Sequence, residues 1–144
     1  MASVDLSTCS TQSPPWIFYI IENRGCTYAG VSPDPVRRLR QGGAKYTTSK
    51  GPGWTHVCLV EGFRTKIEAM QFEWAVKHVP PRNAGGMTNR IKKLYVICAK
   101  ERWTSKAPPA RDIPLTIRWE HYVDADHDAD HEALPDYVKE VGIQ

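Results

Sequence analysis

Residues 16–47 read WIFYIIENRGCTYAGVSPDPVRRLRQGGAKYT, two tyrosine-centred apolar segments followed at once by three arginines. The apolar and aromatic run from Trp16 to Ile21 predicts a buried strand, and Asn23-Arg24-Gly25 supplies turn residues after it. A second strand is expected from about Cys26 to Val31. The two strands together predict a β-hairpin with a tyrosine in each arm.

A short and very basic helix is expected directly after the hairpin. Ser32 or Asp34 can cap its N-terminus, Pro35 suits its first turn, and the glycine pair 42–43 can end it. The arginines of this helix have two interpretations. If the tyrosines serve only as strand formers, the arginines are a solvated helix face; if hydroxyls and a guanidinium converge, the stretch is half of a site that attacks a phosphodiester.

The clearest helix of the chain covers residues 65–78, TKIEAMQFEWAVKH. Thr65 and Glu68 have the spacing of a capping box. Ile67, Met70 and Trp74 recur at i, i+3 and i+7, which is the rhythm of an amphipathic helix. We therefore expect these three side chains to form its apolar face.

Three further segments complete the expected fold. The apolar segment 56–63, HVCLVEGF, predicts a central strand, residues 89–102 predict an amphipathic helix, and 115–123, LTIRWEHYV, predicts a half-buried strand. The fold class is therefore α+β, a small mixed or antiparallel sheet packed with about three helices. We expect a flexible segment at 1–15, one domain at 16–123 and a mobile or loosely docked acidic tail at 124–144.

Charge is distributed unevenly along the chain. Residues 1–119 carry 18 Lys/Arg and 8 Asp/Glu, whereas residues 120–144 carry one Lys and eight acids. A basic body predicts a polyanionic partner, most simply nucleic acid, because Lys and Arg release condensed counterions when they bind it. The acidic tail is a separate feature that can compete with DNA for the basic surface.

The four cysteines favour a reduced, intracellular protein. Cys9, Cys26, Cys58 and Cys98 are widely spaced and include no C-x-x-C pair that would indicate zinc, and Cys58 and Cys98 are expected in the core. There is no signal-peptide pattern, and no apolar run approaches the roughly 20 residues of a membrane span. We expect no membrane partner.

Phosphodiester hydrolysis needs an activated water, a counter-charge at phosphorus and a stabilised leaving oxygen. Glu73 is the best carboxylate for a metal, since it emerges at the edge of an apolar helix face. The alternative is an i, i+4 ion pair with Lys77, which spacing alone favours. Tyr19 and Tyr28 can equally be packed sheet residues, because a tyrosine with a pKa of about 10 is a poor base.

Taken in order, these segments resemble the GIY-YIG nuclease superfamily. Ile17-Phe18-Tyr19 stands at the first family motif and keeps its tyrosine, and Tyr28-Ala29-Gly30 is a near match to the second. The later segments SPDPVRRLRQ, VEGFRTKIEAMQFEW and PLTIRW are most similar to the Slx-type structure-selective endonuclease subunits. The similarity covers roughly residues 16–122.

The resemblance implies a role for each motif residue. Tyr19 and Tyr28 would flank the attacking water, with one of them as general base, and Arg38 would contact the scissile phosphate. Glu73 would be the sole protein ligand of one Mg²⁺ or Mn²⁺ ion, with water and substrate oxygens completing the shell. The implied reaction is metal-dependent hydrolysis of one strand of branched DNA, at a flap, fork or junction.

This sequence departs from the family pattern at two places. The family helix usually continues into a histidine, but here Gln41 runs directly into the glycine pair, so the work of that histidine is either missing or done elsewhere, for example by Lys45 or Tyr46. The Slx-type subunits also carry a RING-like zinc domain that helps to bind a scaffold protein, and the four scattered cysteines cannot build one. A scaffold partner is therefore not expected.

The expected partner is branched double-stranded DNA, and the expected location is the nucleus or another DNA-containing compartment. Recognition should depend on phosphates and shape more than on base edges. The residues predicted to contact the duplex are Arg37, Arg40, Lys45, Lys50, Arg90, Lys92 and Lys93. The main alternative function is a catalytically silent DNA-binding or adaptor module of the same fold; a sequence-specific nuclease would need added base-reading elements.

Overall fold

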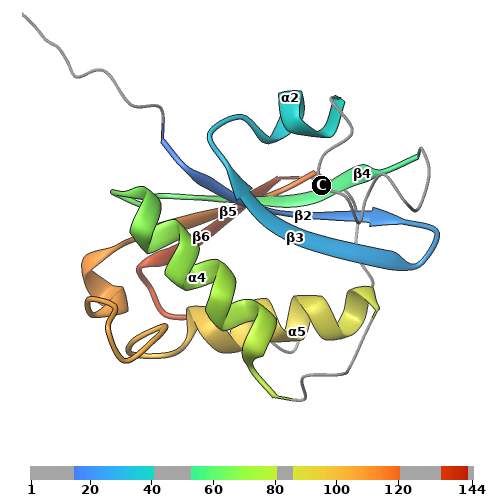
Figure 1. Ribbon diagram of the computed structural model, residues 1–144. Coiled ribbons are helices and arrows are strands. Elements are labelled where there is room, and N and C mark those ends of the chain that lie inside the picture. The colour runs from blue at the N-terminus through green and yellow to red at the C-terminus, as the bar shows by residue number, and fades with distance from the viewer. Residues whose placement is uncertain (1–14, 41–52, 81–85, 121–133, 143–144) are drawn as a thin grey trace, which may run out of the picture.

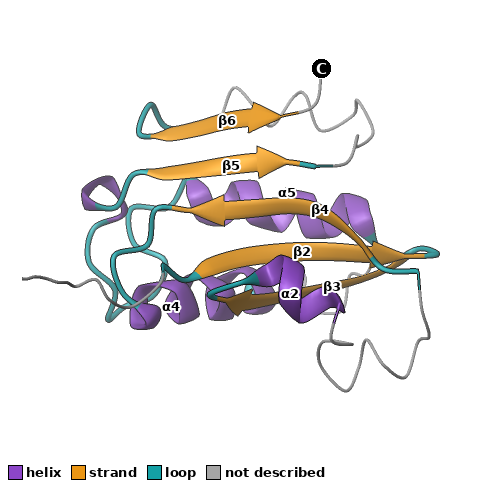
Figure 2. Ribbon diagram, turned by 90° about the horizontal axis from the view of Figure 1, so that it is seen from above, coloured by secondary structure: helices purple, strands orange, loops and turns teal. Residues whose placement is uncertain are grey.

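A five-stranded sheet forms the centre of the molecule in the computed structural model, which describes residues 15–40, 53–80, 86–120 and 134–142. Its strand order is β3-β2-β4-β5-β6 (Figure 2). All neighbouring strands are antiparallel except β5 and β6, which are parallel, so the sheet is mixed. The strands are β2 (Ile17–Asn23), β3 (Cys26–Ser32), β4 (Thr55–Glu61), β5 (Leu115–Trp119) and β6 (Val138–Gly142).

The helices divide between the two faces of this sheet (Figure 1). The short helix α2 (Pro35–Arg40) lies on one face, and α4 (Lys66–His78) and α5 (Met87–Cys98) cover the other. A single 3₁₀ turn, η1 (Ala110–Asp112), precedes β5. The α+β class with three α-helices in the described residues confirms the prediction from sequence.

The predicted hairpin is formed by β2 and β3. Its turn has Arg24 at φ 52° and Gly25 at φ 86°, and two consecutive positive φ angles are the signature of a type I′ turn. The register places Tyr19 opposite Gly30 and Ile21 opposite Tyr28. Because paired residues share a face, both tyrosines lie on the same face of the hairpin.

Aromatic side chains fill the core between the sheet and α4. Phe72 of α4 makes edge-on contacts with Phe18 of β2 at 5.1 Å and with Trp103 at 5.1 Å, and Phe63 lies 5.3 Å from Phe72. Each such pair adds about 0.5–1.5 kcal/mol beyond simple burial. This cluster fixes α4 against the sheet and hence fixes the position of Glu73 on it.

The apolar face predicted for α4 is wrong. Ile67, Met70 and Trp74 are 68%, 46% and 56% exposed. The buried face of the helix is instead lined by a different set of residues, two of which are alanines: Ala69, Phe72, Ala75 and Val76. Alanines let the helix approach the sheet closely, so the contacting face was set by backbone approach rather than by the largest apolar side chains.

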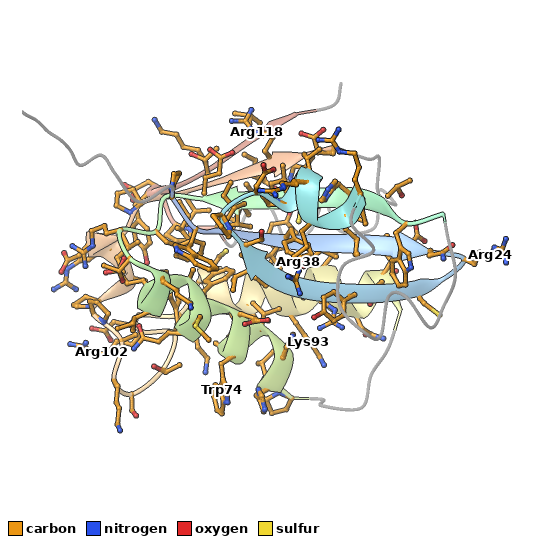
Figure 3. The ribbon with its side chains drawn as sticks, turned by 45° about the horizontal axis from the view of Figure 1, so that its top comes forward. Arg24, Arg38, Trp74, Lys93, Arg102 and Arg118 are labelled. Carbon is orange, nitrogen blue, oxygen red and sulfur yellow. The ribbon has the colours of Figure 1, made fainter. Side chains whose placement is uncertain are left out.

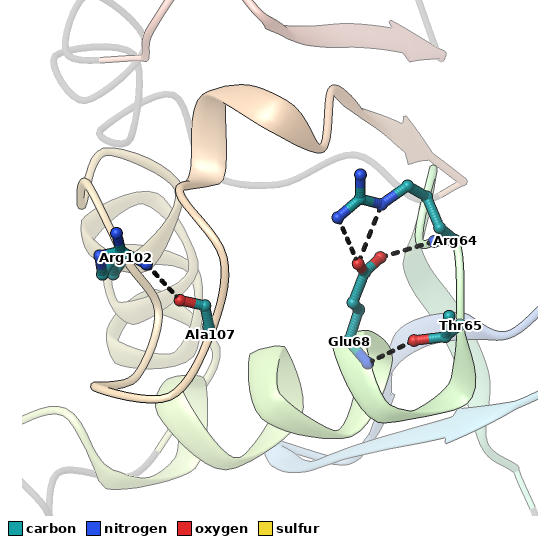
Figure 4. Close-up of polar contacts among 5 residues, drawn as sticks. All are labelled: Arg64, Thr65, Glu68, Arg102 and Ala107. Carbon is teal, nitrogen blue, oxygen red and sulfur yellow. Dashed lines mark hydrogen bonds and ion pairs between the residues drawn. The ribbon is translucent and has the colours of Figure 1, made fainter.

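The N-terminus of α4 is capped largely as predicted (Figure 4). Thr65 Oγ1 accepts a hydrogen bond from the Glu68 backbone N–H at 3.1 Å. The Glu68 carboxylate, however, turns to Arg64, accepting from its backbone N–H at 2.8 Å and from its guanidinium at 2.7 and 2.9 Å. Burial alone raises the pKa of Glu68, but these hydrogen bonds outweigh it and hold the pKa below its ordinary value.

Helix α5 buries the apolar residues predicted for it. Its buried face includes Ile91, Leu94, Tyr95 and Cys98. Lys93, which was predicted to contact the duplex, is only 6% exposed.

The C-terminal tail is not wholly loose. Val138–Gly142 forms β6 and pairs with β5 from Leu115 to Trp119, so the predicted loose docking is wrong for these residues. Glu140 explains the attachment, because its Oε2 accepts hydrogen bonds from Tyr95 Oη at 2.6 Å and Trp119 Nε1 at 2.9 Å. The adjacent charged residues Lys139 and Glu140 in VKEVG obscured this strand in the sequence, although Glu140 serves as the acceptor for Tyr95 and Trp119. Residues 121–133 lie outside the described part.

Replacing Glu140 by alanine should destabilise the protein by about 1–3 kcal/mol, because a buried tyrosine hydroxyl and an indole N–H lose their shared acceptor. Urea denaturation followed by tryptophan fluorescence measures this change. The control is Asp136→Ala, which removes an exposed carboxylate just before β6. Equal stability of the two variants would show that Glu140 does not hold β6.

Cys58 and Cys98 are buried in the core as predicted, and Cys26 is a half-buried free thiol. Cys9 lies outside the described residues. In the part of the chain that the structure describes, every helix is too short or too polar to cross a membrane.

Candidate active site

Four side chains predicted from separate motifs converge beside the outer strand β3. Tyr19 comes from β2, Tyr28 from β3, Arg38 from α2 and Glu73 from α4. The two tyrosine rings lie 6.4 Å apart, and both Arg38 and Glu73 are near enough to the Tyr19 hydroxyl to shift its pKa. The hairpin and both helices therefore contribute to one cluster.

Gly30 makes room for this cluster. A Cβ atom at Gly30 would lie 2.8 Å from Tyr19 Oη and 3.2 Å from Tyr28 Cε2. The Tyr19 side chain thus lies over Gly30 of β3, in space that the Cβ of any other residue at position 30 would occupy. The sequence shows Gly30 only as part of a motif, and its role depends on the cross-strand register with Tyr19.

Helix α2 is held by its first turn and presents Arg38 to the hairpin. Ser32 Oγ accepts from the Asp34 backbone N–H at 3.0 Å, and Asp34 Oδ1 accepts from the Arg37 N–H at 3.1 Å, so both predicted capping residues contribute. Pro35 is buried against the sheet. Figure 3 shows Arg38 extending from α2 toward β2 and β3.

The Tyr19 hydroxyl stays protonated in this environment. The side chain is buried, and burial followed by the nearby Tyr28 raises its pKa above the ordinary value of 10.0. Arg38 opposes this shift by interacting with the hydroxyl, and Glu73 adds to it. Tyr19 is therefore suited to donate a hydrogen bond, while Tyr28 is the more accessible of the two tyrosines.

Glu73 makes the helix ion pair that its spacing suggested. Lys77 Nζ lies 2.9 Å from Glu73 Oε2 and 5.2 Å from the centre of the Tyr28 ring. The Glu73 side chain is 19% exposed. An i, i+4 pair of this kind is worth only about 0.3–0.5 kcal/mol, so it leaves the carboxylate available to a stronger cation.

The residues present fit a single hydrated divalent ion. Among the described residues, no group of three or more His, Cys, Asp or Glu side chains forms a metal cage. Glu73 offers one hard carboxylate beside the cluster, and Mg²⁺ is commonly held by one or two carboxylates with waters and substrate oxygens. Glu73 is the residue that would hold such an ion, and the one-ligand site implied by the family resemblance stays a prediction.

The other predicted DNA contacts differ in exposure. Arg37, Arg40 and Lys92 are exposed, whereas Arg90 is partly buried, with its Nε 3.4 Å from Thr27 Oγ1 on β3. Burial and the neighbouring Arg90 lower the pKa of Lys93, whose place beside β3 is seen in Figure 3. Lys45, Tyr46 and Lys50 lie outside the described residues.

Comparison with known sequences agrees with this arrangement. Residues 15–81 match the family model described as the GIY-YIG catalytic domain, which includes all four clustered residues. The chain belongs to the GIY-YIG nuclease superfamily.

Within that superfamily the chain is similar to proteins named structure-specific endonuclease subunit SLX1. It is 33% identical to the mouse protein over 110 residues, covering 67% of this chain and 40% of the relative. It is 48% identical to the Drosophila mojavensis homolog over 114 residues, covering 69% and 37%, and 36% identical to the human protein over 112 residues, covering 67% and 38%. The chain thus spans about two fifths of the length of these relatives.

Proposed function

We propose that this protein is a metal-dependent, structure-selective DNA endonuclease that hydrolyses one strand of branched DNA. The observation that carries the proposal is the convergence of Tyr19, Tyr28, Arg38 and Glu73 beside β3, next to exposed arginines on α2. An acid, a base, a cation and a metal-binding carboxylate are the groups that phosphodiester hydrolysis requires.

Each of the four residues has a distinct role in the proposed reaction. Arg38 holds a non-bridging oxygen of the scissile phosphate and offsets the charge that develops there. Tyr28 is the general base: it first releases its own hydroxyl proton to solvent, which its greater accessibility allows, and the resulting phenolate takes the proton of the attacking water. Protonated Tyr19 orients that water by donating its hydroxyl hydrogen. Glu73 would hold one Mg²⁺ or Mn²⁺ ion, which when bound would supply positive charge to stabilise the leaving group.

Substrate choice in this proposal depends on shape. The exposed Arg37, Arg40 and Lys92 contact phosphates without reading bases, and Arg90 adds charge beside Thr27 of β3. The relatives are named structure-specific endonuclease subunits, which supports a branched substrate. A DNA substrate implies the nucleus or another DNA-containing compartment, and the proposal includes no scaffold partner.

Cleavage of end-labelled DNA tests this function directly. The substrates are a 5′-flap, a replication fork, a four-way junction and a plain duplex of matched sequence, each with Mg²⁺, with Mn²⁺ or with EDTA. We expect one-strand cuts near the branch, a much slower reaction on the duplex and no reaction in EDTA.

Two results would contradict the proposal. Equal cutting of the plain duplex would remove the structural selectivity. Salt-sensitive binding to branched DNA without cutting in either metal would support the silent DNA-binding module, since binding depends on phosphate contacts and not on the reaction.

A further inference from the structure

A β-bulge in β4 turns His56 toward the candidate active site. In the pairing of β2 with β4, Tyr19 lies opposite Leu59 and Ile20 opposite Cys58, but Ile21 lies opposite His56, so Val57 is the extra residue. Tyr19 and Ile21 point to the same face of β2, and their partners share that face. Without the bulge, His56 would follow Cys58 into the core; with it, His56 faces α2.

The His56 ring contacts the side chain of Tyr19. The two ring centres are 6.1 Å apart and the planes meet at 83°, an edge-to-face contact. The ring also lies near the carbonyl of Pro35, the buried first residue of α2. His56 therefore fills the space between the strand that carries Tyr19 and the helix that carries Arg38.

Among the described residues, none pairs with a ring nitrogen of His56 at ordinary hydrogen-bond geometry. Both Nδ1 and Nε2 are buried, and the Pro35 carbonyl is close. A buried polar atom left unpaired costs about 1–3 kcal/mol, so an apolar residue would serve better if simple packing were the only requirement. The unpaired ring is an observation that stability alone does not explain.

We infer that His56 is a positioning residue, whose neutral imidazole holds Tyr19 and the first turn of α2 in the arrangement that the reaction needs. This inference rests on the proposed nuclease function. It assigns a role to a residue outside the family motifs quoted above, and it links catalytic geometry to the protonation of one side chain.

The surroundings of His56 favour the neutral ring. Burial lowers its pKa from 6.5, against the opposing effects of Glu120, just after β5, and of the Pro35 carbonyl. Within the described part of the chain, the other titratable side chain whose ring contacts His56 is Tyr19 on β2, and the Tyr19 hydroxyl interacts with Arg38 of α2. Protonation would place a second cation beside the Tyr19–Arg38 pair.

The sign of the pH effect follows from this shift. Because the folded pKa lies below the unfolded value of 6.5, the folded state binds fewer protons, and stability falls as pH drops below about 6.5 toward the folded pKa. The cleavage rate should fall over the same acid range, because the neutral fraction decreases about tenfold for each pH unit below the folded pKa.

The test compares pH–rate profiles of single-turnover cleavage for wild type, His56→Phe and His56→Ala, with His78→Phe as control. Phenylalanine retains the edge-on contact and cannot be protonated. The cleavage rate of His56→Phe should therefore decrease less than that of wild type as the pH is lowered. The maximal single-turnover rate constant of the phenylalanine variant should also exceed that of the alanine variant by roughly tenfold, and the protein concentration that gives half of this rate should be the same for both. His78 stacks on exposed Trp74 at 4.1 Å, away from Tyr19, so its variant should keep the wild-type profile.

A second readout does not require cleavage. In NMR spectra the His56 ring signal, assigned by its loss in His56→Phe, should titrate below pH 6.5, and the Tyr19 ring signals should shift with the same midpoint. Two results would overturn the inference. One is a cleavage rate of His56→Phe that falls at low pH as steeply as that of wild type, and the other is a set of Tyr19 ring signals that do not shift when His56 titrates. Absence of cleavage in wild type at every pH would instead contradict the nuclease function, while the NMR result still tests the contact.

Discussion

Replacing Glu73 by glutamine will abolish DNA cleavage while leaving DNA binding intact. The substitution keeps the shape and length of the side chain but removes the one carboxylate that the cluster offers to a divalent ion. Loss of several kcal/mol of charge stabilisation corresponds to a rate decrease of about 10³-fold or more. Single-turnover cleavage of a flap substrate gives the rate, and fluorescence anisotropy gives the affinity.

The matched control is Glu68→Gln, on the same helix. Glu68 accepts three hydrogen bonds from Arg64 at the N-terminus of α4, so its loss should lower stability (Figure 4). It should leave the cleavage rate of the folded protein near the wild-type value. If Glu73→Gln cut as fast as Glu68→Gln, the ion pair with Lys77 would be the whole role of Glu73.

Replacing Gly30 by alanine will slow cleavage by about 10²-fold, since displacement of a reacting group by about 1 Å has an effect of that size. The added Cβ would stand 2.8 Å from Tyr19 Oη and 3.0 Å from its Cζ, so the Tyr19 side chain must move. The contact involves the far end of a flexible side chain, and the fold should survive with a loss of about 1–3 kcal/mol. Cleavage rate and urea denaturation measure the two effects.

A double variant separates crowding from other effects of Gly30→Ala. Tyr19→Phe removes the oxygen that is nearest to the new Cβ, so Gly30→Ala should destabilise the Tyr19→Phe protein less than the wild type. Cleavage should not recover, because the hydroxyl is absent. If the destabilisation were the same in both backgrounds, the cause would lie in the strand backbone and not in the Tyr19 contact.

Local sequence patterns predicted most elements of the fold. The turn Asn23-Arg24-Gly25, the Thr65 cap of α4 and the alternation that begins at Leu115 each depend on neighbours within a few residues, and the structure confirms all three. The α4 face was wrong because helix periodicity offers several faces and only contact with the sheet selects one. Strand β6 was missed because the side chains that hydrogen-bond to its Glu140, Tyr95 and Trp119, come from distant parts of the chain.

In the candidate site too, some features could be predicted from the sequence and others depend on the tertiary structure. The resemblance to a family motif named Tyr19, Tyr28, Arg38 and Glu73 as candidates, because motifs preserve residue type and order, whereas spacing alone left other interpretations of each residue. The sequence could not show that Gly30 leaves the space through which Tyr19 reaches Arg38, or that a bulge at Val57 turns His56 to the same face. Those relations depend on the register between strands, where a shift of one residue reverses the face of a side chain, so they became visible only when the strands were paired.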